Sequence, residues 1–214
     1  MSIRNGEYKP PFVWFGGKSA VADLVWAGMG DVDNYVEPFF GSGAVLFLRP
    51  DGPGNVETVN DADGFVSNFW RALQREPDAV AEAADWPVNE ADLHARHLWL
   101  LGQRDRITER LMGDADFYDA KAAGWWCWGL NCWIGSGWCD WNGKTPQGIG
   151  KIPHASDAGR GVQAAGQIPH AGNAGRGEML TSCGRTALAW LRRLADRLER
   201  VRVVHGDWTR CLNN

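Results

Sequence analysis

A strand that runs directly into a pair of glycines is the feature that most restricts how this chain folds. Residues 34–37 form a short apolar-leaning run, Pro38-Phe39-Phe40-Gly41-Ser42-Gly43 follows, and residues 44–48 have the pattern of the first turns of a helix. Glycines let a backbone approach a ligand closely, and the N-terminus of a helix attracts anionic or polar groups. The pattern therefore predicts a small-molecule site where a strand passes into a helix.

The same alternation of strand and helix continues along the chain. Residues 55–60 form a second short strand that ends at Asp61, and residues 62–74 have helical periodicity. Another helix begins at Arg185 and leads into a strand at residues 201–205. Strands that alternate with helices predict βαβ units and a parallel sheet, so we expect an α/β fold.

The middle of the chain has a different character. Asn89 is placed to cap a long amphipathic helix over residues 93–111, and a further helix is expected over residues 114–123. Six of the 13 tryptophans then fall between Trp125 and Trp141, a cluster that we interpret as the core of a small irregular module with one or two rings exposed. The expected domains are an α/β domain of residues 1–75 and 184–214, and an insertion of residues 76–183.

A glycine-rich repeat occupies the end of the insertion. The sequence Ile152-Pro153-His154-Ala155 returns as Ile168-Pro169-His170-Ala171, a period of 16 residues. Two copies favour a paired extended arm, because a solenoid needs at least about three. Residues 142–185 hold five Lys or Arg against two carboxylates, a local charge of +3 in a chain whose net charge is −4. The chain is therefore not a uniformly basic nucleic-acid binder, but it has a basic face.

Composition and cysteine spacing exclude further classes. No run approaches the ~20 apolar residues of a membrane helix, and residues 1–9 lack an apolar signal-peptide core, so we expect a soluble cytoplasmic protein with no membrane partner. The spacing of Cys127, Cys132 and Cys139 does not fit a zinc site, so no metal is expected. His94 and His97 are predicted to lie on a solvated helix face.

The glycine turn favours a small adenosyl ligand over a dinucleotide. The fingerprint G-x-G-x-x-G fails because Leu46 occupies the third glycine position. Asp61 lies 20 residues after Gly41 at a strand end, where a carboxylate can bind both ribose hydroxyls. Phe15-Gly-Gly-Lys-Ser19 looks like the tail of a phosphate-binding loop, but Phe12 stands where that pattern needs glycine. A tight turn followed by an ordinary capping Asp is the structural alternative.

Three segments together resemble the Dam-type DNA adenine-N6 methyltransferases, in a form common in bacteriophages. They are Pro11-Phe12-Val13-Trp14-Phe15-Gly16-Gly17-Lys18, Tyr35-Val36-Glu37-Pro38-Phe39-Phe40-Gly41-Ser42-Gly43-Ala44-Val45, and Asn60-Asp61-Ala62-Asp63. The resemblance is good over residues 1–75, extends to residues 185–208, and is general in between. It implies a Rossmann-like sheet and the transfer of a methyl group from S-adenosylmethionine to adenine N6 in duplex DNA.

The resemblance also implies which residues would contact the cofactor and the DNA. Asp61 would bind the ribose hydroxyls, and Asp207 would accept from the adenine amine of the cofactor. The alternative for Asp207 is a plain turn at a strand end. The implied cofactor contacts are Trp14, Gly17, Lys18, Glu37, Phe39, Gly41, Gly43, Asp61, Asp207 and Trp208. The insertion would be the target-recognition region, where the basic arm suits phosphate or groove contacts. The implied DNA contacts are Lys144, Lys151, His154, Arg160, His170 and Arg176, and the alternative is a glycine-rich surface loop with incidental arginines.

One element of the family pattern is missing from the sequence. The catalytic motif Asp-Pro-Pro-Tyr holds the target amine and stacks on the flipped adenine, but the only Pro-Pro here is Lys9-Pro10-Pro11-Phe12. An adenine amine is a poor nucleophile, so transfer without these groups should be very slow, and no catalytic residue is assigned. In the family's strand order the first strand would lie at an open edge.

We therefore expect the N-terminal part of a methyltransferase, either truncated or one half of a split enzyme that a second polypeptide completes. A non-catalytic DNA-binding module is the main alternative. A nucleotide-using enzyme of the doubly wound type is disfavoured by the failed phosphate fingerprints.

Overall fold

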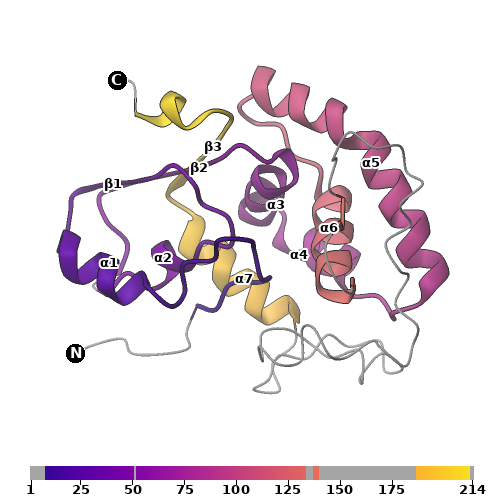
Figure 1. Ribbon diagram of the computed structural model, residues 1–214, viewed down its shortest axis with the longest axis horizontal. Coiled ribbons are helices and arrows are strands. Elements are labelled where there is room, and N and C mark those ends of the chain that lie inside the picture. Colours follow the sequence, from indigo (N-terminus) through magenta and orange to yellow (C-terminus); the bar gives the residue numbers. More distant parts are fainter. Residues whose placement is uncertain (1–7, 51, 134–136, 140–186, 213–214) are drawn as a thin grey trace.

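The computed structural model describes residues 8–50, 52–133, 137–139 and 187–212. The helices and strands follow one another along the chain as labelled in Figure 1. They are α1 (Ala22–Met29), β1 (Asn34–Glu37), α2 (Ala44–Phe47), β2 (Val56–Asp61), α3 (Gly64–Arg75), α4 (Pro77–Ala84), α5 (Glu90–Gly113), α6 (Ala120–Cys132), α7 (Ala187–Leu198), β3 (Val201–His205) and the 3-10 helix η3 (Trp208–Cys211).

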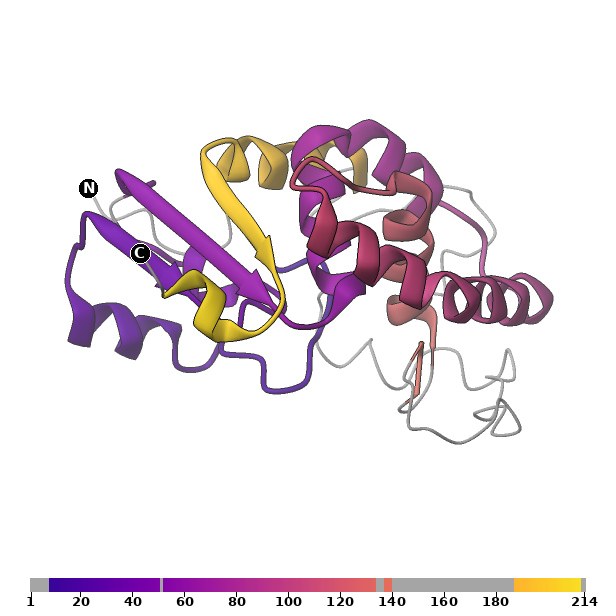
Figure 2. The ribbon, with the colours of Figure 1, turned by 90° about the horizontal axis from the view of Figure 1, so that it is seen from above.

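The described strands form a three-stranded parallel sheet in the order β1-β2-β3. Figure 2 shows the strands side by side and pointing the same way. Tyr35 is paired with Glu57, and Val59 with Val203. This arrangement confirms the expected α/β class and places β1 at an edge of the sheet, as the strand order of the family predicts.

One face of the sheet is buried beneath α1, α2 and α7, which lie on the same side of the strands in Figure 1. The ring of Trp26 on α1 lies 5.0 Å from that of Tyr35 on β1. On the opposite face Val56 and Arg202 are exposed to solvent. The sheet therefore separates a packed side from a more open side.

Helix α3 joins the sheet to the other helices. The side chain of Asp63 accepts hydrogen bonds from the amides of Phe65 and Val66, so it caps the helix and fixes its first residue at Gly64. The sequence pattern placed this helix at residues 62–74, and the extended backbone of Asp63 explains the later start. Because α3 is buried on nearly all sides, it is the central element of the core.

The helices of the middle segment differ in one respect from the expectation. The long helix is confirmed as α5, and the side chain of Asn89 caps it by accepting from the amide of Asp92. The helix expected over residues 114–123 is wrong, because Asp114 ends α5 instead of starting a helix. The next helix, α6, begins after Asp119, whose carboxylate accepts from the amide of Ala122.

The described part of the tryptophan cluster packs in the core as predicted, but not in a small irregular module, because three of its rings stand on the regular helix α6. Trp141 falls outside the described residues. Trp126, Trp128 and Trp138 are buried. The ring of Trp126 lies 5.0 Å from that of Phe12 and 6.0 Å from that of Phe69 on α3. Helix α6 and the N-terminal segment thus share one core with α3, and the domain boundaries expected at residues 75 and 184 stay a prediction.

His97 is not on a solvated face, contrary to the prediction. Its ring lies 5.1 Å from the ring of Trp133 and its Nδ1 accepts from the amide of Cys139. Burial lowers the pKa of His97, and nearby His94 lowers it further. The chain after α6 covers this turn of α5, which helical periodicity alone does not reveal.

None of the helices in the described ranges combines the length and the apolarity that crossing a membrane requires.

Candidate cofactor site

A cavity of about 300 Å³ opens at the carboxyl ends of β1 and β2. Three separate stretches of chain line it, namely residues 14–18, residues 39–44 and Asp61. Ligands of open α/β sheets bind outside the carboxyl ends of the strands, and small-molecule pockets start at about 300 Å³. The lining residues are Trp14, Phe15, Gly16, Gly17, Lys18, Phe39, Phe40, Gly41, Ser42, Ala44 and Asp61.

Gly41 is held at the centre of this wall. Its amide donates to Oδ2 of Asp61 at 2.8 Å, and its carbonyl accepts from Nε1 of Trp70 at 2.8 Å. Its φ is +53°, and a Cβ at this position would lie 2.7 Å from Cδ1 of Trp14. Only glycine fits both the left-handed backbone and the close approach of the indole. The turn that the sequence singles out therefore brings Trp14 and Asp61 together.

Gly43 has a structural role beside the cavity. Its φ is +77°, and a Cβ would lie 2.6 Å from a ring atom of Phe47. It stands at the N-cap of α2, which has only four residues. Because so short a helix has a small dipole, the glycine turn offers a ligand mainly its close-lying backbone rather than a helix N-terminus.

Asp61 presents an oriented carboxylate. Oδ2 accepts from the amide of Gly41 and Oδ1 accepts from the amide of Asp63 at 2.9 Å. Burial raises the pKa of Asp61, although these two amides favour its charged form. Each carboxylate oxygen has a second lone pair, so both can still accept a hydrogen bond from a ligand.

Lys18 ties the N-terminal segment to the loop after β1. Its Nζ lies 3.3 Å from Oε1 of Glu37 and also donates to the carbonyl of Phe39. The hydroxyl of Tyr35 donates to Oε2 of Glu37 at 2.7 Å. Burial raises the pKa of Glu37, and Glu37 is only 5% exposed. Lys18 lines the cavity, whereas Glu37 lies behind the wall and orients Lys18.

Trp14 connects the cavity to the core. Its ring lies 6.1 Å from that of Phe12 and 5.6 Å from that of Trp126 on α6. Phe15, the next residue, is fully exposed at the edge of the cavity, and Phe39 is 59% exposed. Phe15 was not among the residues predicted to bind the cofactor, although it stands inside the same N-terminal segment.

Asn60 holds the ends of the three strands together, a role that the sequence did not reveal. Its Nδ2 donates to the carbonyl of Pro38 at 3.1 Å and to that of Gly206 at 3.0 Å. His205 adds to this junction, because its Nδ1 lies 3.1 Å from the carbonyl of Asp61. The one feature of the sequence that points to this role is the position of Asn60 directly before Asp61 at a strand end.

Some predicted site residues lie elsewhere. Asp207 and Trp208 do not line the cavity. The carboxylate of Asp207 accepts from the amide of Thr209 and caps η3, and both side chains are exposed to solvent. The predicted DNA contacts fall outside the described residues: Lys144, Lys151, His154, Arg160, His170 and Arg176.

Within the described residues, no group of three or more His, Cys, Asp or Glu side chains is arranged to hold a metal ion.

Comparisons with known proteins add to this geometry. A comparison with curated proteins gave no match for this chain. A family model does match the segment that holds Trp14, the glycine turn and Asp61. Residues 14–97 match the model of the D12 class N6 adenine-specific DNA methyltransferase family.

Proposed function

We propose that this chain binds S-adenosylmethionine in the cavity beside β1 and β2 and serves the methylation of adenine N6 in duplex DNA. The observation that carries the proposal is the shared cavity, to which Trp14, Lys18, Gly41 and Asp61 all contribute. The family match covers the same residues. The order of the parallel strands supports a partial Rossmann-like sheet, and the proposed place of action is the cytoplasm.

The chemistry of the donor set fits this cofactor. The free lone pairs of Asp61 suit the ribose hydroxyls. The indole of Trp14 suits a cationic sulfonium group, since an aromatic face attracts cations. Gly41 leaves room for a ligand against the backbone, and Lys18 would hold the loop around the amino-acid part of the cofactor. When bound, S-adenosylmethionine supplies the methyl group, and this chain supplies binding, orientation and exclusion of water.

The acceptor groups for the target amine are assigned to a second polypeptide. The 214 residues contain no Asp-Pro-Pro-Tyr. Within the described residues, β1 has a strand neighbour on one side only, so its other side can pair with an added strand. In this proposal the partner completes the sheet and the site, and the basic arm of residues 142–185 contacts the DNA. The alternative that the missing motif favours is a DNA-binding module without catalysis.

Isothermal titration calorimetry with S-adenosylmethionine tests the proposal. The wild-type chain should bind the cofactor in preference to ATP, and Lys18→Met should weaken binding by at least about tenfold, the loss of ~1.4 kcal/mol. Lys121→Met is the matched control, because Nζ of Lys121 lies over the ring of Trp99, and neither residue lines the cavity. A wild-type chain that does not bind S-adenosylmethionine would refute the proposal.

A methylation assay separates the two alternatives and tests the partner. With labelled S-adenosylmethionine and duplex DNA, the purified chain alone should transfer no methyl group above background. Robust methylation by the chain alone would refute the need for a second polypeptide. Binding of DNA without binding of S-adenosylmethionine would favour the DNA-binding module.

A further inference from the structure

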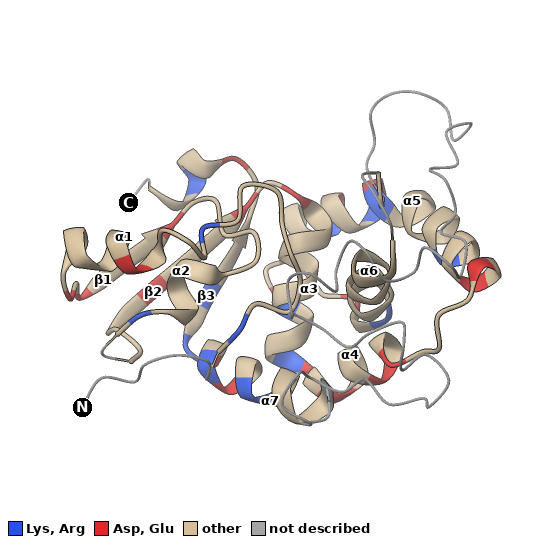
Figure 3. Ribbon diagram, turned by 60° about the horizontal axis from the view of Figure 1, so that its bottom comes forward, with Lys and Arg blue, Asp and Glu red and all other residues tan. Residues whose placement is uncertain are grey.

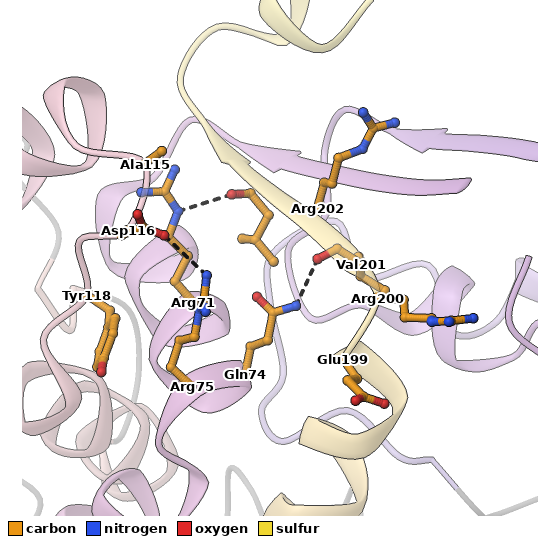
Figure 4. Close-up of a pocket in the computed structure, with 11 residues that line it drawn as sticks. Arg71, Gln74, Arg75, Ala115, Asp116, Tyr118, Glu199, Arg200, Val201 and Arg202 are labelled. Atoms are coloured by element: carbon orange, nitrogen blue, oxygen red, sulfur yellow. Dashed lines mark hydrogen bonds and ion pairs between the residues drawn. The ribbon is translucent and has the colours of Figure 1, made fainter. Parts of the chain in front are cut away.

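A second cavity, of about 490 Å³, lies along the edge of β3 that has no strand neighbour among the described residues. The end of α3, the loop that precedes α6, and the turn from α7 into β3 surround it (Figure 4). We call it the β3 groove. Its lining residues are Arg71, Gln74, Arg75, Ala115, Asp116, Tyr118, Glu199, Arg200, Val201, Arg202 and Val203. None of the residues predicted to contact the cofactor or the DNA lines it, and its lining residues from Ala115 to Val203 lie outside the family match.

Arg71 places a buried positive charge at the groove. It is 9% exposed, and its guanidinium donates to the carbonyls of Val203, Leu111 and Asp114. All three acceptors are backbone carbonyls, which accept from Nε and Nη1 without neutralising the charge. Burial lowers the pKa of Arg71, while nearby Asp114 favours the charged form. The guanidinium therefore keeps a positive potential in the groove wall.

Three further arginines surround the groove. Arg75 pairs with Asp116 at 3.3 Å in an exposed ion pair that solvent screens. Arg200 and Arg202 are exposed, and within the described residues neither makes an ion pair. Figure 4 shows these two arginines on the opposite side of β3 from Arg71 and Arg75. Four arginines against Asp116 and Glu199 leave the groove with a charge of +2.

The backbone of β3 is already occupied along this edge. Gln74 donates to the carbonyl of Val201, and Arg71 donates to that of Val203 (Figure 4). An added strand would have to displace both side chains, so the edge is closed to strand pairing. What remains for a ligand are the exposed guanidinium groups of Arg200 and Arg202, which suit phosphate oxygens.

We propose that the β3 groove binds the phosphodiester backbone of duplex DNA. This inference rests on the proposed function, which supplies the DNA. Arg200 stands in the turn before β3 and Arg202 stands in β3, two positions further along the chain. Both side chains are exposed, so both can contact phosphates of one strand of DNA. Basic residues are interspersed with Asp196 and Glu199 where α7 passes into β3, and Figure 3 shows blue and red residues side by side on α7. A groove that is open and basic fits a polyanion that extends past it.

The position of the groove also fits a duplex held for methylation. The groove lies at the amino end of β3, whereas the carboxyl end of β3 reaches Asp61 through His205. Five extended residues span roughly 17 Å, about half of a turn of B-DNA. One duplex is therefore long enough to contact the groove and present a base near the cofactor cavity.

The test is the salt dependence of DNA binding. Fluorescence anisotropy with a labelled duplex, without cofactor, gives the dissociation constant of the full chain from low to moderate KCl. The groove variant is Arg200→Gln with Arg202→Gln. The matched control is Arg106→Gln with Arg192→Gln, which removes the same charge from two exposed arginines that are ion-paired to Asp119 and Asp78. Circular dichroism checks that both variants are folded, and S-adenosylmethionine binding is measured in each.

The groove variant should bind DNA several-fold more weakly, and its salt slope should fall by about 1.8, or 0.9 for each lost phosphate contact. The control should keep the wild-type slope. An unchanged slope in the groove variant, an equal fall in both variants, or a wild-type chain that does not bind DNA would overturn the proposal. If the slope falls as expected but the chain does not bind S-adenosylmethionine, the groove stands and the proposed function fails.

Discussion

The amide of Gly41 donates a 2.8 Å hydrogen bond to Oδ2 of Asp61, which joins the turn after β1 to the carboxyl end of β2. The two residues are 20 positions apart in the chain. A second amide, that of Asp63, holds the other oxygen of the same carboxylate. The protein therefore orients the carboxylate of Asp61 before a ligand binds, which reduces the conformational entropy that this side chain loses on binding.

Asp61→Asn should weaken S-adenosylmethionine binding. The substitution replaces one acceptor oxygen with an NH₂ group, which would face the amide of Gly41 or of Asp63. Because charge-assisted hydrogen bonds are about twice as strong as neutral ones, we expect a loss of at least about tenfold in affinity by calorimetry. Asp196→Asn, at an exposed position on α7, is the control and should bind as the wild type does. Equal affinity of both variants would contradict the ribose contact.

Gly41→Ala should disturb both the fold and the site. The added Cβ meets Trp14 at 2.7 Å in a left-handed backbone, so we expect the free energy of unfolding to fall by about 1–3 kcal/mol. Gly102→Ala on α5 is the control, because a Cβ there meets nothing within 4 Å, and it should stabilise the protein by up to ~1 kcal/mol. Urea denaturation measures both. If Gly41→Ala raised the free energy of unfolding as Gly102→Ala is expected to do, the indole of Trp14 would not approach Gly41 so closely.

Arg197→Met should destabilise the packed side of the sheet. Arg197 on α7 donates to both carboxylate oxygens of Glu57, at 2.7 and 2.8 Å, and Arg49 donates to the same carboxylate at 3.1 Å. Removing one partner of a buried ion pair lowers the free energy of unfolding by about 3 kcal/mol, because the remaining buried charge loses part of its neutralisation. Arg192→Met, which breaks the exposed pair with Asp78, should give no resolvable change in urea denaturation. An Arg197 variant as stable as this control would contradict the assignment.

Two buried glutamates should give opposite pH dependences of stability. Burial opposes ionisation of Glu57, but Arg197 holds its pKa below the ordinary value. Relative to Glu57→Gln, the wild type should therefore be stabilised above about pH 4.3, and this advantage should disappear as the pH falls through the lowered pKa. Burial raises the pKa of Glu37, so the wild type should lose stability relative to Glu37→Gln as the pH rises above about 4.3. Urea denaturation across this range measures both slopes, and slopes of the same sign would contradict the two environments.

Much of the fold could be predicted because its signals are local. The strands at residues 34–37 and 201–205 agree with β1 and β3, and the cap at Asn89 agrees with the start of α5. The tight turn at Gly41 and Gly43 could also be predicted, because glycine adopts the positive φ that both positions have. The helix expected after Asp114 was wrong, because Asp114 and Asp119 are equally good capping residues by sequence and tertiary packing selects Asp119.

The site could be predicted only in part. Trp14, Lys18 and Asp61 do share a cavity, but Asp207, assigned by resemblance, faces solvent at the cap of η3. Glu37 lies behind the cavity wall, where it bonds to Tyr35 and orients Lys18. The sequence contains no pattern that indicates burial of this kind. Phe15 was passed over because exposure is decided by the packing of other segments.

The parallel α/β pattern, the glycine turn and the acidic strand end could be recognised in the amino-acid sequence, since each depends on neighbouring residues. The contact between the ring of Trp14 and Gly41, and the groove that Arg71 and Arg202 line together from positions 131 residues apart, exist only in the folded chain. Burial and electrostatic potential are set by all groups within several ångströms, whatever their separation along the chain.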